Sequence, residues 1–202
     1  MAFIDTVPVD RAEGEVRAMY EKTQVAAGYV PNYAKVFSHR PQVMAAWSGL
    51  LASIRANLDA RRYELVTLAA ARAMRSSYCM LAHGSVLRKR FYSAEQLTAI
   101  AGSAAGGELA PADLAAMTFA EKVAADASAI TGEDVRTLRQ HGFSDTEIFD
   151  VAAAAAARCF FSKLLDALGA EPDAAFEGLE GELRQKLTPG RPISRHAPEQ
   201  LS

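Results

Sequence analysis

The chain has 202 residues, 50% of them hydrophobic, and its 22 basic residues are balanced by 24 acidic ones. This length and composition allow one substantial core, so a single domain is the default expectation. The basic residues are scattered, apart from the triplet Arg88, Lys89 and Arg90. Three residues are too few for a nucleic-acid-binding surface, so we expect no nucleic-acid partner.

The start of the chain favours a cytoplasmic location. Asp5 and Asp10 stand where a signal peptide needs an apolar run. The most apolar stretch, 151–161, is too short to cross a bilayer, so we expect no membrane partner. In a reducing compartment, Cys79 and Cys159 are expected to be thiols rather than a structural disulfide.

Apolar residues recur at helical spacing along nearly the whole chain, and no segment alternates strictly, which predicts helices joined by short turns. Polar N-cap residues or prolines mark most of the starts, and glycines mark several ends. The expected helices are 10–28, 41–57, 59–74, 78–90, 93–102, 111–126, 131–142, 144–169 and a last helix after Pro172.

The last residues form a separate expectation. We predict one helical domain over residues 1–188 and a tail over 189–202 that contains Pro189, Pro192 and Pro198. A tail without an obvious core to join is expected to be mobile or to cross to a partner subunit.

Cys79 and His83 are the first candidates for chemistry. They stand four residues apart, so on a helix they share a face. Only a thiolate is a competent nucleophile, and a neighbouring base together with a position in the first turn of a helix favours it. Ser76 or Ser77 is expected to cap that helix. A free cysteine is among the most buried residue types, so a purely structural pair stays open.

Glu64 is the candidate third member, because a carboxylate can orient the histidine of a nucleophile–base pair. For two straight antiparallel helices, Glu64 lies roughly 15 Å and His83 roughly 9 Å from the turn, by the rise per residue. We therefore expect them to meet only if the turn or the helices bend, or through water.

Other cysteine and polar positions are assigned structural roles. Cys159 lies among phenylalanines and is expected in the core. No metal is expected, because Cys79 and His83 lack a third and fourth ligand nearby in sequence, and no cofactor is expected either. A faint internal repeat relates Glu147, Ser162 and Asp166 to Glu64, Cys79 and His83 by the same offsets.

The segment 64–84 carries a family resemblance. A glutamate, eleven residues and then Cys-x-x-Cys-x-x-x-His resembles the signature of the alkylhydroperoxidase D-like (carboxymuconolactone decarboxylase-like) family, and Ser76 replaces the first cysteine. Similarity to the peroxidase-related branch extends over roughly residues 10–180. The matching positions are Glu64, Tyr78, Cys79, Ala82, His83, the run 28–32, Pro41 and the run 164–169.

The resemblance implies an all-α helical bundle with a central hairpin that bears the motif. It also implies Cys79, His83 and Glu64 as catalytic residues, with Ser76 and Tyr78 as supporting motif positions. Substrates would be a hydroperoxide or a small organic molecule, the reductant an external thiol, and the assembly a dimer, trimer or hexamer. Because Ser76 cannot form a disulfide, only a cycle with one cysteine is possible within the motif.

Two alternatives to a thiol peroxidase remain open. One is a non-redox lyase or decarboxylase in which His83 and Glu64 act as acid and base on a small carboxylated substrate. The other is a scaffold that kept the fold after losing catalysis. Activity that survives replacement of Cys79 would favour the lyase, and an ordinary buried thiol would favour the scaffold.

Overall fold

A computed structural model describes residues 2–103 and 108–201 and confirms the all-α expectation. No β-strand occurs among these residues, where Val30 and Glu199 form an isolated bridge. Short 3-10 turns cover Val9–Arg11, Phe37–His39, Ala127–Ala129 and Ala174–Gly178. The helices are α1 (Gly14–Ala27), α2 (Asn32–Val36), α3 (Pro41–Arg55), α4 (Ala60–Ala73), α5 (Ser77–Arg90), α6 (Ala94–Gly102), α7 (Pro111–Asp126), α8 (Gly132–Gln140), α9 (Asp145–Ala167) and α10 (Gly181–Lys186).

Most helix starts follow the sequence signals. The Asp59 carboxylate accepts a hydrogen bond from the Arg62 backbone N–H at 2.9 Å. Ser93 and Ser144 form the two expected capping boxes at α6 and α9. Pro41 occupies the first turn of α3, where its missing N–H removes no helical hydrogen bond.

The two ends of the chain differ from expectation. Asp10 lies in a 3-10 turn, and α1 begins only at Gly14. After Pro172 a 3-10 turn and the short α10 replace the single helix. Gly178 and Gly181 stand at this break, and glycine is a poor helix former.

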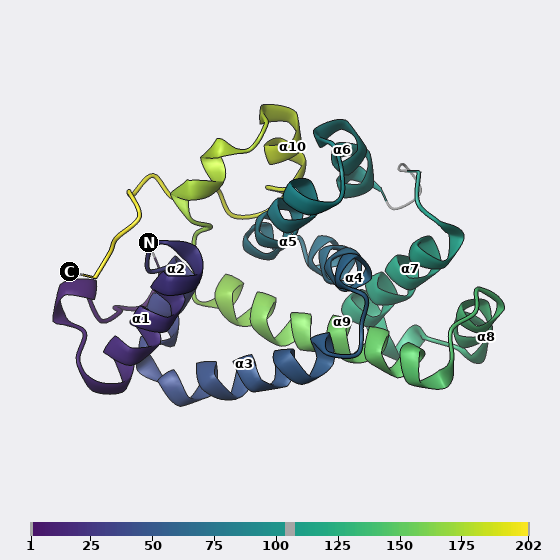
Figure 1. Ribbon diagram of the computed structural model, residues 1–202, viewed down its shortest axis with the longest axis horizontal. Coiled ribbons are helices and arrows are strands. Elements are labelled where there is room, and N and C mark those ends of the chain that lie inside the picture. The colour runs from purple at the N-terminus through teal and green to yellow at the C-terminus, as the bar shows by residue number, and fades with distance from the viewer. Residues whose placement is uncertain (1, 104–107, 202) are drawn as a thin grey trace.

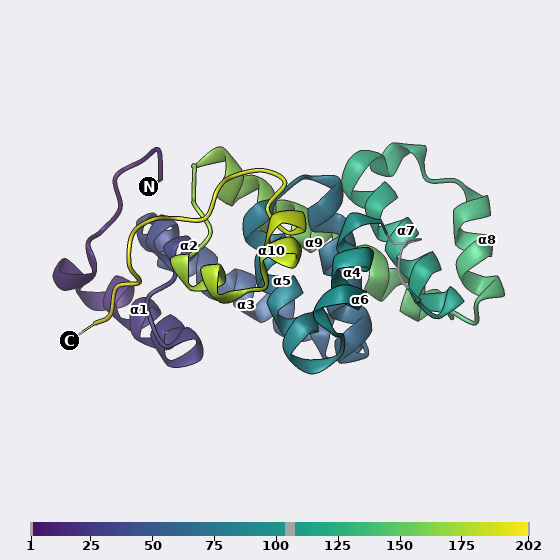
Figure 2. The ribbon, with the colours of Figure 1, turned by 90° about the horizontal axis from the view of Figure 1, so that it is seen from above.

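The helix α4 is the centre of the molecule. It packs on α5, α7 and α9, and its residues 65–71 are all buried. Figure 1 shows α4 surrounded by these helices, while α3 and α9 run along the lower side and α6 and α10 lie above. Figure 2 places α1 and α2 at one end of the molecule and α7 and α8 at the other. A polar side chain on α4 therefore projects into the interior.

The connection between α4 and α5 is held by the C-terminal segment. Arg75 adopts a left-handed φ of 57° between the helices. Its guanidinium donates to the Pro189 carbonyl at 2.8 Å, and the Gly190 N–H donates to the Ser77 hydroxyl at 2.8 Å. A Cβ at Gly190 would lie 2.3 Å from the Arg75 carbonyl oxygen, so this close approach requires glycine.

The rest of the tail also lies on its own chain. The Val30 N–H donates to the Glu199 carbonyl at 2.8 Å, and the Leu201 N–H donates to the Gln24 side chain at 2.6 Å. In Figure 1 the yellow segment runs from α10 to the end that holds α1 and α2. Instead of projecting away, the described residues of the expected mobile or partner-crossing tail contact their own subunit.

Candidate active site

Glu64 and His83 meet directly. The Glu64 Oε2 atom lies 2.6 Å from His83 Nδ1, and the side chains are 5% and 12% exposed. The estimate from straight antiparallel helices was wrong for this pair because α4 and α5 cross. In Figure 1, α4 is strongly foreshortened and α5 runs obliquely over it. The contact is direct, so no bridging water is needed to join the two residues.

The hydrogen bond fixes the tautomer of His83. Burial and the charge of Arg158 lower the pKa of His83, and the bond to Glu64 only partly offsets them. Burial raises the pKa of Glu64, but His83, Arg55 and Arg158 outweigh it, so this pKa is lowered. A carboxylate can only accept, so neutral His83 donates from Nδ1 and keeps Nε2 as a base.

Cys79 lies in the first turn of α5 and is 1% exposed. The helix start favours a negative charge at this place. A cationic side chain also lies beside the sulfur. The Arg158 Nη1 atom of α9 lies 3.6 Å from Cys79 Sγ. Burial lowers the pKa of Arg158, but the negative charges available on Cys79 and Tyr63 outweigh it and raise that pKa.

Arg158 is a candidate site residue that the sequence analysis did not identify. It is 5% exposed and has no ion pair with a carboxylate anywhere in the described chain. Its guanidinium carbon lies 5.8 Å from the Trp47 ring centroid and 5.5 Å from that of Phe161. The sequence does contain a signal for it, since Arg158 is a single arginine inside the apolar stretch 151–161. A charge buried in such a stretch needs a partner, which indicates a polar site nearby.

Tyr78 supports the site without touching the sulfur in any described hydrogen bond. Its hydroxyl donates to Asp173 Oδ2 at 2.6 Å and accepts from the Tyr33 N–H at 3.1 Å. Burial, with Asp173 beside it, raises the pKa of Tyr78 well above its ordinary value. Tyr78 therefore ties the start of α5 to α2 and to the segment that follows α9.

Ser76 holds the N-cap position of α5, but its side chain makes no capping hydrogen bond. It is fully buried and lies near Asp166 on α9, whose pKa is raised by burial and lowered in part by Ser76. Ser77, the other expected cap, instead accepts from the tail at Gly190. Of the positions in the faint repeat, Asp166 lies near the motif, whereas Glu147 belongs to the capping box at the other end of α9.

Cys159 lies outside the site. It is only partly buried, with its side chain packed against the core, and burial raises the pKa of its thiol. The described residues contain no group of three or more His, Cys, Asp or Glu side chains placed to hold a metal ion. Within the same ranges, no helix is long and apolar enough to cross a membrane.

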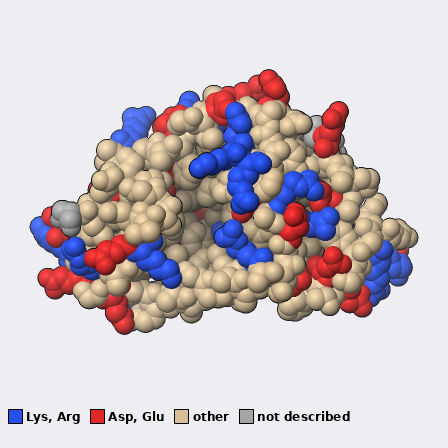
Figure 3. Space-filling model, viewed as in Figure 1, with Lys and Arg blue, Asp and Glu red and all other residues tan. Residues whose placement is uncertain are grey.

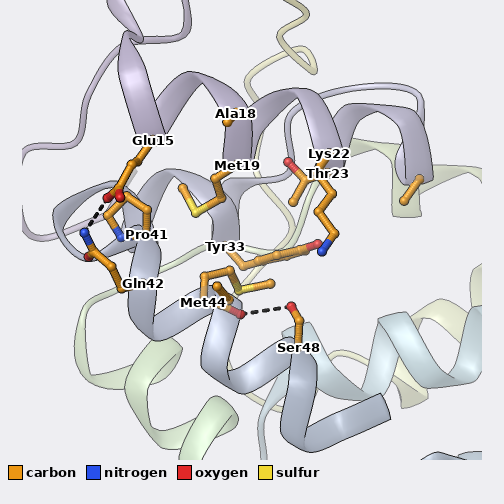
Figure 4. A pocket seen from close by; sticks show the side chains of 12 residues that line it. Glu15, Ala18, Met19, Lys22, Thr23, Tyr33, Pro41, Gln42, Met44 and Ser48 are labelled. Atoms are coloured by element: carbon orange, nitrogen blue, oxygen red, sulfur yellow. Dashed lines mark hydrogen bonds between the residues drawn. The ribbon is translucent and has the colours of Figure 1, made fainter.

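A pocket of about 550 Å³ lies between α1 and α3, away from Cys79. Figure 4 shows Met19 and Met44 facing each other across it, with Tyr33 at its base. The Tyr33 ring packs on Phe161, with centroids 5.6 Å apart, so a layer of rings separates this pocket from Arg158. Figure 3 shows a separate hollow on one face, with Lys and Arg side chains beside it over α5 and α10.

Comparisons with known proteins agree with this arrangement. The structure matches a peroxidase-related protein from Ralstonia eutropha JMP134, described as an alkylhydroperoxidase AhpD core, with a TM-score of 0.78 and 24% identity over 87% of this chain and 94% of that one. A peroxidase-related protein from Silicibacter sp. TM1040 gives 0.77 and 21% over 88% and 94%. A cysteine-to-alanine variant of the debrominase Bmp8, bound to 2,3,4-tribromopyrrole, gives 0.68 and 16% over 91% and 98%.

These likenesses define the class of protein as the all-α AhpD-like fold. Residues 41–122, which contain α3 to α6 and most of α7, match the model of the carboxymuconolactone decarboxylase family. Residues 41–122 are therefore similar to that family, and the described chain shares the AhpD-like fold. No curated protein sequence matches it significantly.

Proposed function

We propose that this protein is a thiol-dependent peroxidase-like oxidoreductase that uses Cys79 as its only redox-active cysteine. The observation that carries the proposal is the buried Arg158 guanidinium, 3.6 Å from Cys79 Sγ and without a carboxylate ion pair in the described chain. A buried cation needs a negative partner, and the Cys79 thiolate would supply it. The family's association with enzymatic roles agrees with a catalytic use of the site.

The other roles rest on the position of His83 one helical turn from Cys79 and on its hydrogen bond to Glu64. His83 accepts the thiol proton on Nε2, and Glu64 holds the ring in that tautomer and favours the imidazolium that forms. The thiolate attacks the distal peroxide oxygen, the O–O bond breaks, and the leaving alkoxide or hydroxide takes the proton from His83. The product is a sulfenic acid on Cys79.

The return half of the cycle needs an external thiol, because Ser76 cannot supply a second sulfur. A small thiol or a partner protein attacks the sulfenic acid, releasing water and forming a mixed disulfide, and a second thiol reduces that disulfide. The proposal places the protein in the cytoplasm, where such thiols are abundant, and includes assembly as a homo-oligomer.

Brief exposure to hydrogen peroxide, followed by a sulfenic-acid trap and mass spectrometry, tests the proposal. Cys79 should be trapped before Cys159. The matched variants are Cys79→Ser, which should abolish peroxide consumption with a thiol reductant, and Cys159→Ser, which should retain it. An inert Cys79, or earlier modification of Cys159, contradicts the proposal.

The His83–Glu64 pair also favours a second candidate, a lyase of the carboxymuconolactone decarboxylase type. The pair can move a proton without the sulfur, so lyase turnover should survive Cys79→Ser. The substrate panel should include a brominated pyrrole as well, because one structural neighbour is a debrominase. Bromide release that requires Cys79 and a thiol reductant would make an aryl halide, rather than a peroxide, the electrophile.

A further inference from the structure

Three polar residues form a stripe along the buried side of α9. Arg158, Ser162 and Asp166 follow one another at intervals of four residues, so they share a helix face. Arg158 is 5% exposed, Ser162 is fully buried, and Asp166 is half-buried. Burial of polar side chains in a mainly apolar helix lowers the stability of the fold unless these side chains have hydrogen-bond or ion-pair partners. We call these three residues the α9 polar stripe.

The α9 polar stripe faces Cys79 and Ser76 of α5. Arg158 contacts Cys79 Sγ at one end, and Asp166 lies near Ser76 at the other, although Ser76 Oγ has no hydrogen-bond partner in the described chain. Cys79 and Ser76 stand three residues apart and also share a helix face. Along α9, Ser162 lies midway between the residues that make these two contacts.

Two donors of the α9 polar stripe are unused. Within residues 2–103 and 108–201, neither Arg158 Nε nor Ser162 Oγ has a hydrogen-bond partner, although both atoms are buried. Buried polar groups in native proteins are nearly always satisfied, and exceptions require a reason such as a catalytic role or a ligand. Arg158 Nε belongs to the guanidinium that contacts the proposed nucleophile, and Ser162 lies one helical turn further along the same face of α9.

We propose that Arg158 Nε and Ser162 Oγ bind the oxygen atom that Cys79 removes from a hydroperoxide. This inference rests on the proposed function and adds the atoms that receive the oxygen. Before the reaction the two donors hold the distal peroxide oxygen, and after O–O cleavage they hold the same oxygen as the sulfenic acid. The ligand is therefore hydrogen peroxide or a small alkyl hydroperoxide, whose terminal O–H can enter between the helices.

Arg158 and Ser162 have different proposed roles, because one interacts with the Cys79 sulfur and the other with the peroxide oxygen. The positive charge of Arg158 favours the thiolate before any substrate arrives. The neutral Ser162 hydroxyl adds little charge, but its hydrogen bond would hold the distal oxygen in line for attack by the sulfur while the other oxygen leaves. Removal of Ser162 should therefore affect oxidation more than it affects ionisation of the thiol.

The test uses the full chain with Cys159→Ser, so that Cys79 is the only thiol. Alkylation by iodoacetamide across a pH series measures thiolate formation and needs no oxygen site. Stopped-time oxidation by hydrogen peroxide, followed by sulfenic-acid trapping, measures oxygen transfer. Ser162→Ala should leave the alkylation profile unchanged and slow oxidation by roughly tenfold, because one of the two hydrogen bonds that position the distal oxygen is lost.

Two further variants complete the test. Ser85→Ala is the control, because it also removes a helical hydroxyl, but one that is partly buried and bonded to the Leu81 carbonyl. It should change neither rate. Arg158→Lys keeps the positive charge and removes Nε, so oxidation should slow more than alkylation. Thermal unfolding of each variant confirms that the fold is retained.

The outcomes separate this inference from the proposed function. Equal oxidation rates in Ser162→Ala and the parent overturn the oxygen site and leave Cys79 as the nucleophile. Parallel slowing of alkylation and oxidation in Ser162→Ala also overturns it, because the hydroxyl would then serve the sulfur. A parent protein whose Cys79 does not react with hydrogen peroxide overturns both.

Discussion

At the scale of single residues, the surroundings of Cys79 and Cys159 differ in charge. Cys79 lies beside the Arg158 guanidinium, whereas burial raises the pKa of the Cys159 thiol. The four-residue spacing of Cys79 and His83 was readable from the sequence because both lie on one helix. The contact from Arg158 was not, because it joins residues 79 positions apart and depends on how α9 packs on α5.

Replacement of Glu64 should test the His83 tautomer. In Glu64→Gln the side-chain amide can donate to Nδ1, which moves the ring proton to Nε2 and removes the base. We expect peroxide oxidation of Cys79 at neutral pH to slow by roughly a hundredfold, a typical contribution of a general base. Trapping of the sulfenic acid measures the rate. Glu95→Gln, at an exposed position on α6, is the control, and equal effects of both changes would contradict the assigned role.

His83 should also make the fold sensitive to acid. Burial lowers its pKa below the ordinary value of 6.5, so on acidification the unfolded chain binds a proton before the folded chain does. The free energy of unfolding should therefore fall as the pH drops through about 6.5, by roughly 1.4 kcal/mol for each unit of pKa difference. The lowered pKa of Glu64 adds a further loss below about 4.5.

Urea unfolding at several pH values between 7.5 and 5 measures this loss. His83→Asn keeps an amide donor for Glu64 and removes the titrating ring, so its stability should vary less over the same range. If His83→Asn and the parent lose stability in parallel, His83 is not the source of the acid sensitivity.

At the scale of elements, short sequence motifs correctly predicted several helix starts. The capping boxes at Ser93 and Ser144 and the proline at the start of α3 are contained in a few consecutive residues, and the structure confirms them. The crossing of α4 and α5 is set by packing against α7 and α9, which no short window contains. For that reason the direct contact between Glu64 and His83 was not predicted.

The hairpin makes a further prediction about position 76. An N-cap side chain lies close to the third helical residue, and in α5 that residue is Cys79. In Ser76→Cys, the introduced thiol should attack the Cys79 sulfenic acid and form a disulfide within the motif. Turnover with a dithiol reductant should rise above that of the parent, since only the resolving step is being added.

Two measurements decide the outcome for Ser76→Cys. Mass spectrometry of the peroxide-treated variant should show loss of two hydrogens between positions 76 and 79, and a coupled assay should show faster peroxide consumption. Ser77→Cys is the control, because its neighbour in the fold is the tail at Gly190. A folded Ser76→Cys variant with neither disulfide nor faster turnover would make the motif a structural remnant.

At the scale of the whole molecule, an uncharged surface runs along α3. Residues 43–54 contain no charged side chain, and Val43 and Leu50 are 39% and 49% exposed at positions one heptad apart. Phe160 of α9, 47% exposed, lies beside them, with its ring centroid 5.5 Å from that of Trp47. Figure 3 shows few charged atoms along the lower edge, where Figure 1 places the middle of α3.

This α3–α9 surface, defined by Val43, Leu50 and Phe160, should be the contact between copies of the chain. Adjacent exposed apolar side chains on a protein surface mark interaction sites, and most homo-oligomers bury the same patch on both subunits. Sedimentation velocity at micromolar concentration should show an oligomer for the parent. Leu50→Asp places a charge in each copy of the contact and should shift the protein to monomer. Val25→Asp, at an apolar position on α1 that is 89% exposed, should remain assembled. A monomeric parent, or dissociation of both variants alike, would contradict the assignment of this surface.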